Sequence, residues 1–346
     1  MARSLLVGSL NLESPDAVFA AVGAALREDV ARVPDGETGE RLGWIFSLAP
    51  RFAAVDALEL APASWGEHID HHFDQYRPRD GVAPEDVEFG NLGYADDAIA
   101  SYARFRAAVE SGTLRDDTRF QVALPTAFMA VMAFVDIEHR DALIPAYERA
   151  LAREIARMLE VIDPERLAIQ WDTPCEVSIT EGVSPPVTWS FDDAVAEVGR
   201  MAALVPEGVE LGFHHCYGDP PDAETGHGKH WMEPRDAGAM VRLTNAMLDH
   251  IDRRVDWVHM PVPMERDDDD FFAPLRALRL PEDTELYLGL VHFEDGTAGT
   301  QRRIDTAARH VASFGVATEC GIGRIPRDEV VPTLEIHRDV LLPPRA

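Results

Sequence analysis

The sequence is poor in lysine and cysteine, and it has no long hydrophobic run. Lys229 is the single lysine, and 32 basic residues against 61 acidic ones give a net charge of −29. Nucleic acids and anionic membrane surfaces are bound by basic patches, so this balance argues against both as partners. No apolar stretch approaches the roughly 18 residues that span a bilayer. We therefore expect a soluble protein with no nucleic-acid partner and no membrane segment.

The three cysteines, Cys175, Cys216 and Cys320, are too few and odd in number for a disulfide framework. Free thiols that can bind metal in a reducing compartment fit this count better. The first residues also lack an apolar core followed by a small-residue cleavage site, and they run directly into a predicted strand. Together these features predict a cytoplasmic protein.

Short apolar runs alternate with amphipathic stretches along the chain, which is 46% hydrophobic and 27% charged, as in globular proteins. We expect strands over residues 4–10, 30–34, 120–124, 167–171, 209–213, 255–259, 286–291 and 316–318. Helices are expected over residues 15–26, 141–162, 191–204, 236–251, 271–278 and 300–314, with a short helix in the tail. Residues 47–115, after the second strand, are expected to form an irregular insertion of mixed helical and loop character, whose role the sequence leaves open.

Eight strand–helix units with few hairpin signals predict parallel strands joined by crossover helices. This number of units fits a single (β/α)8 barrel, α/β in class, with one domain over residues 1–346. A dinucleotide-binding fold is disfavoured, because Gly8-Ser9 after the first strand falls short of a glycine-rich phosphate-binding loop.

His214 and Cys216 follow the fifth predicted strand, and they have the spacing of metal ligands. Residues i and i+2 of a strand point to the same side, so the imidazole and the thiol leave this strand end together. Cys320 follows the last predicted strand, and a barrel brings its strand ends to one mouth. Two thiols and an imidazole predict a zinc site. Cys175, placed after a proline in an expected loop, is not predicted to be a ligand.

Other polar residues occur at most of the remaining strand ends. A lone carboxylate can simply cap a turn, and a lone histidine can be a hydrogen-bonded wall residue. Their concentration at one end of a barrel instead predicts an active site. The set comprises Ser9, Glu37, Trp171, Asp172, His259, His292 and Glu294.

Two further segments are disfavoured as parts of this site. The run Asp267-Asp268-Asp269-Asp270 could bind a cation, but such runs are more often solvated loops or helix N-termini. The glycine-containing segment with His227, Lys229 and His230, after the fifth strand, is expected to be a lid or a surface loop.

At the level of its strand ends, the chain resembles the catalytic barrel of cobalamin-independent methionine synthase and of the related zinc-dependent alkyl-thiol transferases that act on coenzyme M. The resemblance lies in Gly8-Ser9, Glu37, Gln170-Trp171-Asp172-Thr173-Pro174, His214-x-Cys216 and Cys320. It implies zinc held by His214, Cys216 and Cys320. The glutamate ligand of methionine synthase is missing near the sixth strand, so the fourth ligand is His259, Glu265 or an open position. The resemblance does not extend to the folate-binding half, and related decarboxylase barrels contain no metal.

The resemblance also implies a site for a small thiol. Ser9, Glu37, Trp171 and Asp172 would bind the substrate, with Glu37 and Asp172 orienting it and His292 or Glu294 acting in proton transfer or donor recognition. Zinc lowers the pKa of a bound thiol and so produces a nucleophile. The resulting hypothesis is a transferase that moves a methyl or alkyl group to or from a small thiol, with Zn²⁺ as cofactor and an alkyl donor as second substrate.

Two alternatives follow from the same residues. If zinc holds a water at an open position, the protein would be a lyase or hydrolase acting on a small organic substrate. A barrel that binds a small ligand without turnover is the other alternative. The substrate, the direction of transfer and the oligomeric state do not follow from the sequence, and a homodimer is as compatible with it as a monomer.

Overall fold

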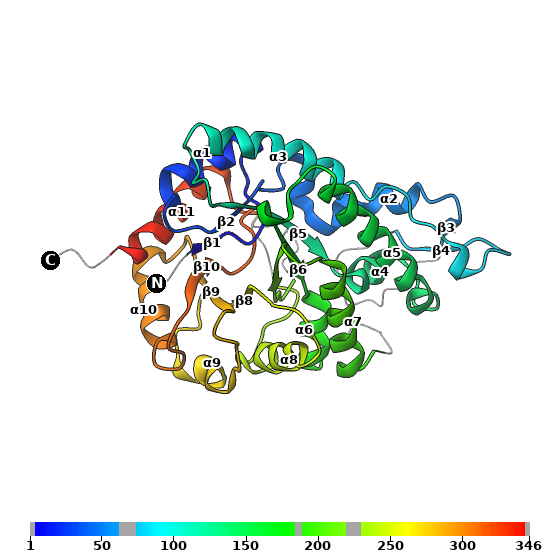
Figure 1. Cartoon of the computed structure of the whole chain (residues 1–346). Coiled ribbons are helices and arrows are strands. Elements are labelled where there is room, and N and C mark those ends of the chain that lie inside the picture. Colours follow the sequence, from blue (N-terminus) through cyan, green and yellow to red (C-terminus); the bar gives the residue numbers. More distant parts are fainter. Residues whose placement is uncertain (1–3, 62–73, 184–188, 219–229, 343–346) are drawn as a thin grey trace.

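The protein is built around a ring of parallel strands enclosed by helices (Figure 1). In the computed structural model, residues 4–61, 74–183, 189–218 and 230–342 are described. Among them, eight parallel strands follow one another in the order β1-β10-β9-β8-β7-β6-β5-β2. The predicted (β/α)8 barrel is therefore confirmed. Its strands are β1 (Ser4–Leu5), β2 (Arg32–Pro34), β5 (Arg119–Pro125), β6 (Leu167–Asp172), β7 (Glu210–His214), β8 (Trp257–Pro261), β9 (Glu285–Val291) and β10 (Gly315–Thr318).

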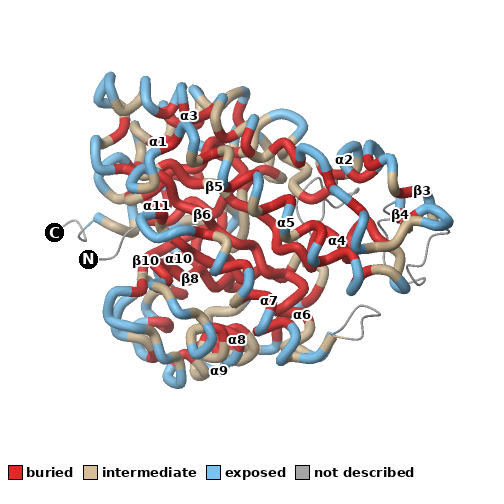
Figure 2. The backbone as a smooth tube through the Cα atoms, turned by 45° about the vertical axis from the view of Figure 1, so that its right-hand side comes forward, coloured by how far each residue is buried: buried red, intermediate tan, exposed pale blue. Residues whose placement is uncertain are grey.

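The helices lie outside the ring and cover the apolar outer faces of its strands, so that buried residues concentrate in the strands and in the inner helix faces (Figure 2). They are α1 (Pro15–Leu26), α2 (Ala49–Ala53), α3 (Tyr94–Glu110), α4 (Ala127–Phe134), α5 (Arg140–Leu159), α6 (Pro174–Glu181), α7 (Phe191–Leu204), α8 (Gly238–Leu248), α9 (Asp269–Phe272), α10 (Gly296–Ala307) and α11 (Arg327–Leu341). None of the described helices is long and apolar enough to cross a membrane.

The insertion expected to mix helical and loop character contains α3, which has 17 residues. Four other helices differ from the expectations. The helices α4 and α6 were not expected, and the tail helix α11 has 15 residues and is not short. The helix α10 starts at Gly296 and ends at Ala307, earlier at both ends than expected. Within the same insertion, β3 (Leu58–Leu60) and β4 (Tyr76–Pro78) form an antiparallel pair that lies, with α2, beside the barrel (Figure 1).

The barrel closes between β1 and β2 through buried side chains as well as backbone. The backbone of these two elements meets at one parallel bridge, between Ser4 and Val30. Inside the barrel, the amide of Gln121 donates to the carbonyl of Leu6 at 2.9 Å, and that of Gln170 donates to the carbonyl of Val7 at 2.7 Å. These hydrogen bonds satisfy buried carbonyls where the strand ladder is short.

Arg32 fills the end of the barrel away from the strand C-termini. Its guanidinium is buried, ion-pairs with Glu210 at 2.9 Å and with Glu285 at 3.0 Å, and lies 4.2 Å from the centre of the Trp257 ring. Because a buried charge is stable only when it is paired, the two carboxylates hold this arginine in place. A layer of apolar side chains packs in the barrel interior: Leu5, Val7, Ala168, Trp257, Tyr287 and Ala317.

The acidic run at residues 267–270 begins a helix. Asp268 caps the N-terminus of α9 by accepting a hydrogen bond from the amide of Phe271 at 3.0 Å. Neighbouring carboxylates of the run form ion pairs at the surface, including that of Asp269 with Arg309. The interpretation as a helix N-terminus is confirmed.

Candidate functional site

Three residues with metal-binding side chains meet at the mouth of the barrel. His214 ends β7, Cys216 follows two residues later, and Cys320 follows β10. The two sulfur atoms are 3.9 Å apart, and the ligand atoms of all three residues lie within 4.8 Å of one another. Two thiolates bound tetrahedrally to one zinc at about 2.3 Å would be separated by about 3.8 Å. The spacing of the thiols therefore matches a zinc site.

The surroundings of these residues also suit a metal. Nε2 of His214 is buried and has no hydrogen-bond partner among the described residues, so its lone pair is available to a ligand. Hydrogen bonding with Cys320 and burial raise the pKa of the Cys216 thiol well above its usual value. A thiol in this position becomes a thiolate only when a cation compensates its charge. The donor set of one imidazole and two sulfurs is a set that zinc takes.

His259 occupies a different place from that of a metal ligand. Its Nδ1 lies 2.7 Å from Nδ1 of His214, and its Nε2 donates to the carbonyl of Thr318 at 3.0 Å. Both ring nitrogens are therefore engaged, and His259 lies behind His214 rather than beside the sulfurs. The other candidate for a fourth ligand, Glu265, is exposed. The cluster thus offers three protein ligands.

A pair of carboxyl groups lies beside the cluster. Burial and the charge of Glu37 raise the pKa of Asp172 well above its usual value, although Asp172 accepts a hydrogen bond from Gln170 at 2.8 Å. Burial likewise raises the pKa of Glu37 to about 7; the charge of Arg41 opposes the shift and that of Asp35 adds to it. A carboxyl group whose pKa is raised by a neighbouring carboxylate favours a ligand that carries positive charge.

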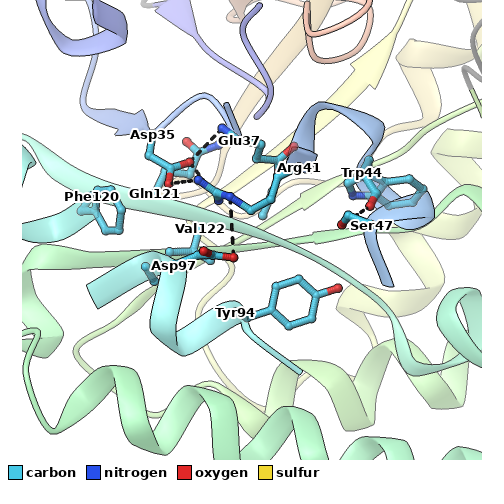
Figure 3. A pocket seen from close by; sticks show the side chains of 12 residues that line it. Asp35, Glu37, Arg41, Trp44, Ser47, Tyr94, Asp97, Phe120, Gln121 and Val122 are labelled. Carbon is cyan, nitrogen blue, oxygen red and sulfur yellow. Dashed lines mark hydrogen bonds and ion pairs between the residues drawn. The ribbon is translucent and has the colours of Figure 1, made fainter. Parts of the chain in front are cut away.

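The loop that carries Glu37 is held in a strained conformation. Glu37 has φ of 47° and Trp44 has φ of 48°, values that are uncommon for residues other than glycine. Asp35 fixes the loop, because it accepts hydrogen bonds from the backbone amide of Glu37 at 2.9 Å and from Arg41 at 2.6 Å. Figure 3 shows Arg41 between Asp35 and Asp97. Such strain persists only where surrounding contacts impose it, and here it directs Glu37 into the site.

Glu37 lines a small cavity of about 40 Å³. Its walls combine charged residues of the loop with aromatic residues, among them Trp44 beside Ser47 and Tyr94 on α3 (Figure 3). Burial raises the pKa of Tyr94 well above its usual value, so this phenol is neutral. A neutral aromatic wall beside carboxylates is an environment that accommodates an organic cation.

Ser9 lies against the turn that follows Cys320. The turn contains Gly321 and Gly323, and a Cβ atom at either position would lie 2.5 or 2.7 Å from Oγ of Ser9. The close approach therefore requires glycine at both positions. Ser9 is buried, and it joins the end of the first strand to the loop that carries Cys320.

A second cavity, of about 120 Å³, lies on the other side of Cys320 and is lined by His230, His292, Glu294 and Glu319. Nε2 of His292 donates to the carbonyl of Val262 at 2.9 Å, and its Nδ1 is 3.5 Å from Glu319. Burial lowers the pKa of His292 to about 4, so its imidazole is neutral at pH 7. Glu294 is exposed at the rim.

His230 belongs to this second cavity. It forms ion pairs with Glu319 and, at 2.6 Å, with Glu233. Burial opposes its charge, but the hydrogen bonds and charges of these two carboxylates raise its pKa to about 10. His230 therefore contacts the site directly, which its assignment to a lid or surface loop did not anticipate. His227 and Lys229 lie outside the described residues.

Two residues lie away from the mouth. Trp171 is adjacent to Asp172 on β6, so its side chain points to the opposite face, where it is buried in the core between strands and helices. This placement corrects the expectation that Trp171 contacts a substrate. Cys175 lies on α6 and not in a loop, and its sulfur packs 3.1 Å from that of Met129.

The sequence interpretation missed several residues that shape the site. Trp44 and Tyr94 lie in or near the section expected to be irregular, where no periodic pattern drew attention to them. Gln170 had a usable signal: it precedes Asp172 by two residues, so both side chains share the inner face of β6. Thr318 contributes its backbone carbonyl, and the residue types in a sequence cannot indicate a backbone contact of this kind.

Comparison with known proteins gives likeness at the level of fold. Searches of family models and of curated proteins returned no match. Among solved structures, a B12-independent methionine synthase from Shewanella sp. W3-18-1, in complex with selenomethionine, is 14% identical with a TM-score of 0.59, over 98% of this chain and 97% of that one. A methyltransferase from Methanosarcina mazei is 10% identical with a TM-score of 0.52, over 96% and 94% of the two chains. At these identities, the likeness establishes a shared barrel fold.

Proposed function

We propose that this protein is a zinc-dependent transferase that moves a methyl or alkyl group to or from a small thiol. The observation that carries the proposal is the position of His214, Cys216 and Cys320, whose ligand atoms gather within 4.8 Å at the barrel mouth. Zinc held there would stabilise a substrate thiol as its nucleophilic thiolate. The names of the similar structures, a methionine synthase and a methyltransferase, are consistent with this chemistry.

The carboxyl groups beside the cluster indicate the class of thiol. The charge of Glu37 raises the pKa of Asp172, and an ammonium group between the two carboxyl groups would relieve this repulsion. We therefore assign the thiol substrate to the aminothiols. Ser9 would support the Cys320 loop, and Arg41 would keep the Glu37 loop in its strained conformation through Asp35.

The second cavity would receive the alkyl donor. When the alkyl group passes to the thiol, the C–S bond forms and the bond to the donor's leaving atom breaks, so that the leaving atom can take up a proton. His292 lines this cavity as a neutral imidazole whose Nδ1 faces Glu319. His230 lines the same cavity and is protonated at pH 7, because its pKa is about 10, so it would deliver the proton. The only N–H hydrogen of neutral His292 is donated to the carbonyl of Val262, so His292, like Glu294 at the rim, would contact the donor.

Thiol binding by the cobalt-substituted protein tests this proposal. A thiolate bound to cobalt gives an intense charge-transfer band, so titration with cysteamine and with 2-mercaptoethanol compares an aminothiol with an analogue that lacks the ammonium. We expect cysteamine to bind at least about tenfold more tightly, corresponding to one ion pair of about 1.4 kcal/mol. The Glu37→Gln variant should lose this preference, whereas Glu40→Gln, a change at an exposed position of the same loop, should retain it.

Equal binding of the two thiols would contradict the aminothiol assignment, and no change in the band with either thiol would contradict thiol activation. The three-ligand cluster also suits a hydrolase, since a catalytic zinc commonly has three protein ligands and a water. Turnover of a substrate in the absence of any thiol would favour that second function.

A further inference from the structure

The ring of His259 bridges His214 and the backbone of β10. Its Nδ1 is 2.7 Å from Nδ1 of His214, and its Nε2 is 3.0 Å from the carbonyl oxygen of Thr318. His259 is fully buried, and His214 is 1% exposed. Each of these contacts must therefore be a formed hydrogen bond, because water cannot replace it.

The carbonyl of Thr318 determines where the protons of both rings lie. A carbonyl oxygen accepts hydrogen bonds only, so Nε2 of His259 must carry a hydrogen. A neutral imidazole has one N–H group, and burial favours the neutral form. Nδ1 of His259 is then an acceptor, and the hydrogen in the short contact between the rings must belong to Nδ1 of His214. Nε2 of His214 is left with its lone pair.

That lone pair is where a metal is expected. Within the described part of the chain, Nε2 of His214 is buried without a hydrogen-bond partner, and the ligand atoms of His214, Cys216 and Cys320 lie close together. We infer that His259 is a positioning residue, which holds His214 in the tautomer that presents Nε2 to zinc. The inference deepens the proposed function and rests on its metal site. His259 would then influence the metal by its hydrogen bond to His214, and would not itself be a metal ligand.

The backbone around β9 and β10 makes the bridge possible. β9 lies between β8 and β10, and Gly289 of β9 is closely approached from both sides. A Cβ atom there would lie 3.0 Å from the Thr318 oxygen, 2.7 Å from Cα of Glu319 and 3.0 Å from Cα of Pro261. The register of β9 with β10 also shifts between Val316 and Thr318. Without a side chain at Gly289, the ring of His259 can reach across to β10.

Thr318 connects the His259 bridge to Cys320, the ligand of the proposed metal site that follows β10. Its carbonyl accepts the hydrogen bond from His259, while its hydroxyl donates to the carbonyl of Cys320 at 2.7 Å. One residue therefore fixes the tautomer of His214 and the backbone of Cys320. This arrangement predicts that zinc affinity depends on His259 although His259 does not touch the ion.

The variants His259→Leu and His259→Asn separate this role from general packing. Leucine has no acceptor for Nδ1–H of His214, whereas the amide oxygen of asparagine lies close to the former position of Nδ1. We expect the zinc dissociation constant, measured by competition with a chelator, to rise about 10- to 100-fold in His259→Leu, with much of the loss recovered in His259→Asn. His337→Leu removes another fully buried histidine, which is hydrogen-bonded to Ser4, and should leave zinc affinity unchanged.

Nitrogen NMR of the wild-type protein, labelled with ¹⁵N-histidine, observes the tautomers directly and does not depend on the folding of a variant. Signals are assigned from those that disappear in His214→Asn and His259→Asn, and the tautomers are then measured in the wild type. In metal-free protein, we expect the hydrogen of His214 on Nδ1 and that of His259 on Nε2. On addition of zinc, Nε2 of His214 should shift while Nδ1 keeps its hydrogen.

A hydrogen on Nε2 of His214 in the metal-free protein, or a zinc affinity unchanged in His259→Leu, would overturn the inference. A wild-type protein that shows the expected tautomers but binds no zinc would contradict the proposed function instead. The two failures are therefore distinguishable.

Discussion

The alternation of side chains along a strand explains how single residues reach the barrel mouth. His214 and Cys216 share one side of the chain, and Gln170 and Asp172 share the inner face of β6. This two-residue period can be read from the sequence, so the metal cluster and the carboxyl at Asp172 could be predicted. The same period places the side chain of Trp171 on the outer face of β6. The motif that contains Asp172 did not by itself show that Trp171 points away from the site.

The position of His259 could not be predicted from its own strand. The sequence places it at the end of β8, but the direction of its ring depends on Gly289 and on the shifted register of β10. Contacts of this kind join elements that are distant in sequence. They become visible only when the backbone is in place.

The raised pKa of Glu37 predicts how stability depends on pH. In the folded protein this pKa is about 7, against 4.5 for an unperturbed glutamate, so between these pH values the native state binds more protons than the unfolded state. The contribution of Glu37 to the free energy of unfolding must therefore decrease as pH rises from about 4.5 to about 7. Denaturant unfolding of the metal-free protein should show a steeper decline for the wild type than for Glu37→Gln.

Glu40→Gln serves as the control, since Glu40 is exposed in the same loop and its substitution should keep the wild-type slope. Parallel pH profiles for the wild type and Glu37→Gln would show that Glu37 is not held in a desolvated site.

At the scale of elements, the contact between β7 and β8 leaves no room for a side chain at Gly212. A Cβ atom there would lie 1.9 Å from the ring of Trp257, which is fully buried in the barrel interior. The Gly212→Ala variant should lose at least about 2 kcal/mol of unfolding free energy, because the ring cannot move without displacing its neighbours. Chemical denaturation monitored by fluorescence measures this loss.

Gly199 on α7 provides the matched substitution. A Cβ atom there would make ordinary contacts, the nearest at 3.7 Å, and alanine is a better helix former than glycine. Gly199→Ala should therefore raise the unfolding free energy by up to about 1 kcal/mol. Similar effects of the two substitutions would argue against the close packing of β7 on Trp257.

The lengths of α3 and α11 were not expected, because α3 lacks the usual signal at its start and α11 contains a helix breaker. The residue before α3 is Gly93, in a left-handed conformation, where a serine, threonine or aspartate would have marked the start of the helix. The tail helix α11 contains Pro332, which made a long helix unexpected. In both cases, packing against the barrel stabilises a helix that the local sequence alone favours only weakly.

At the scale of the whole molecule, the regular alternation of strands and helices was sufficient to predict the barrel. Crossover helices force neighbouring strands to be parallel, and a ring of such units places all strand C-termini at one mouth. The means of closure could not be predicted. The side-chain amides of Gln121 and Gln170 donate hydrogen bonds to the carbonyls of Leu6 and Val7, next to the short strand β1. No local sequence pattern distinguishes such glutamines from surface residues.

The barrel also explains why Cys216 and Cys320, 104 positions apart in sequence, approach within 3.9 Å. Their strands β7 and β10 are separated by β8 and β9, yet the ends of all four strands converge over the mouth. The proposed metal site is thus a property of the closed fold, and both cysteines are required for it.

Metal analysis of the purified protein tests the central claim most directly. We predict about one zinc per chain in the wild type and in Cys175→Ser, whose thiol packs against Met129, and a loss of most of this zinc in Cys320→Ser. The three proteins are purified without added metal and measured by mass spectrometry of the element. A zinc content that Cys320→Ser does not change, or a wild type that acquires no zinc even when the ion is supplied, would contradict the account.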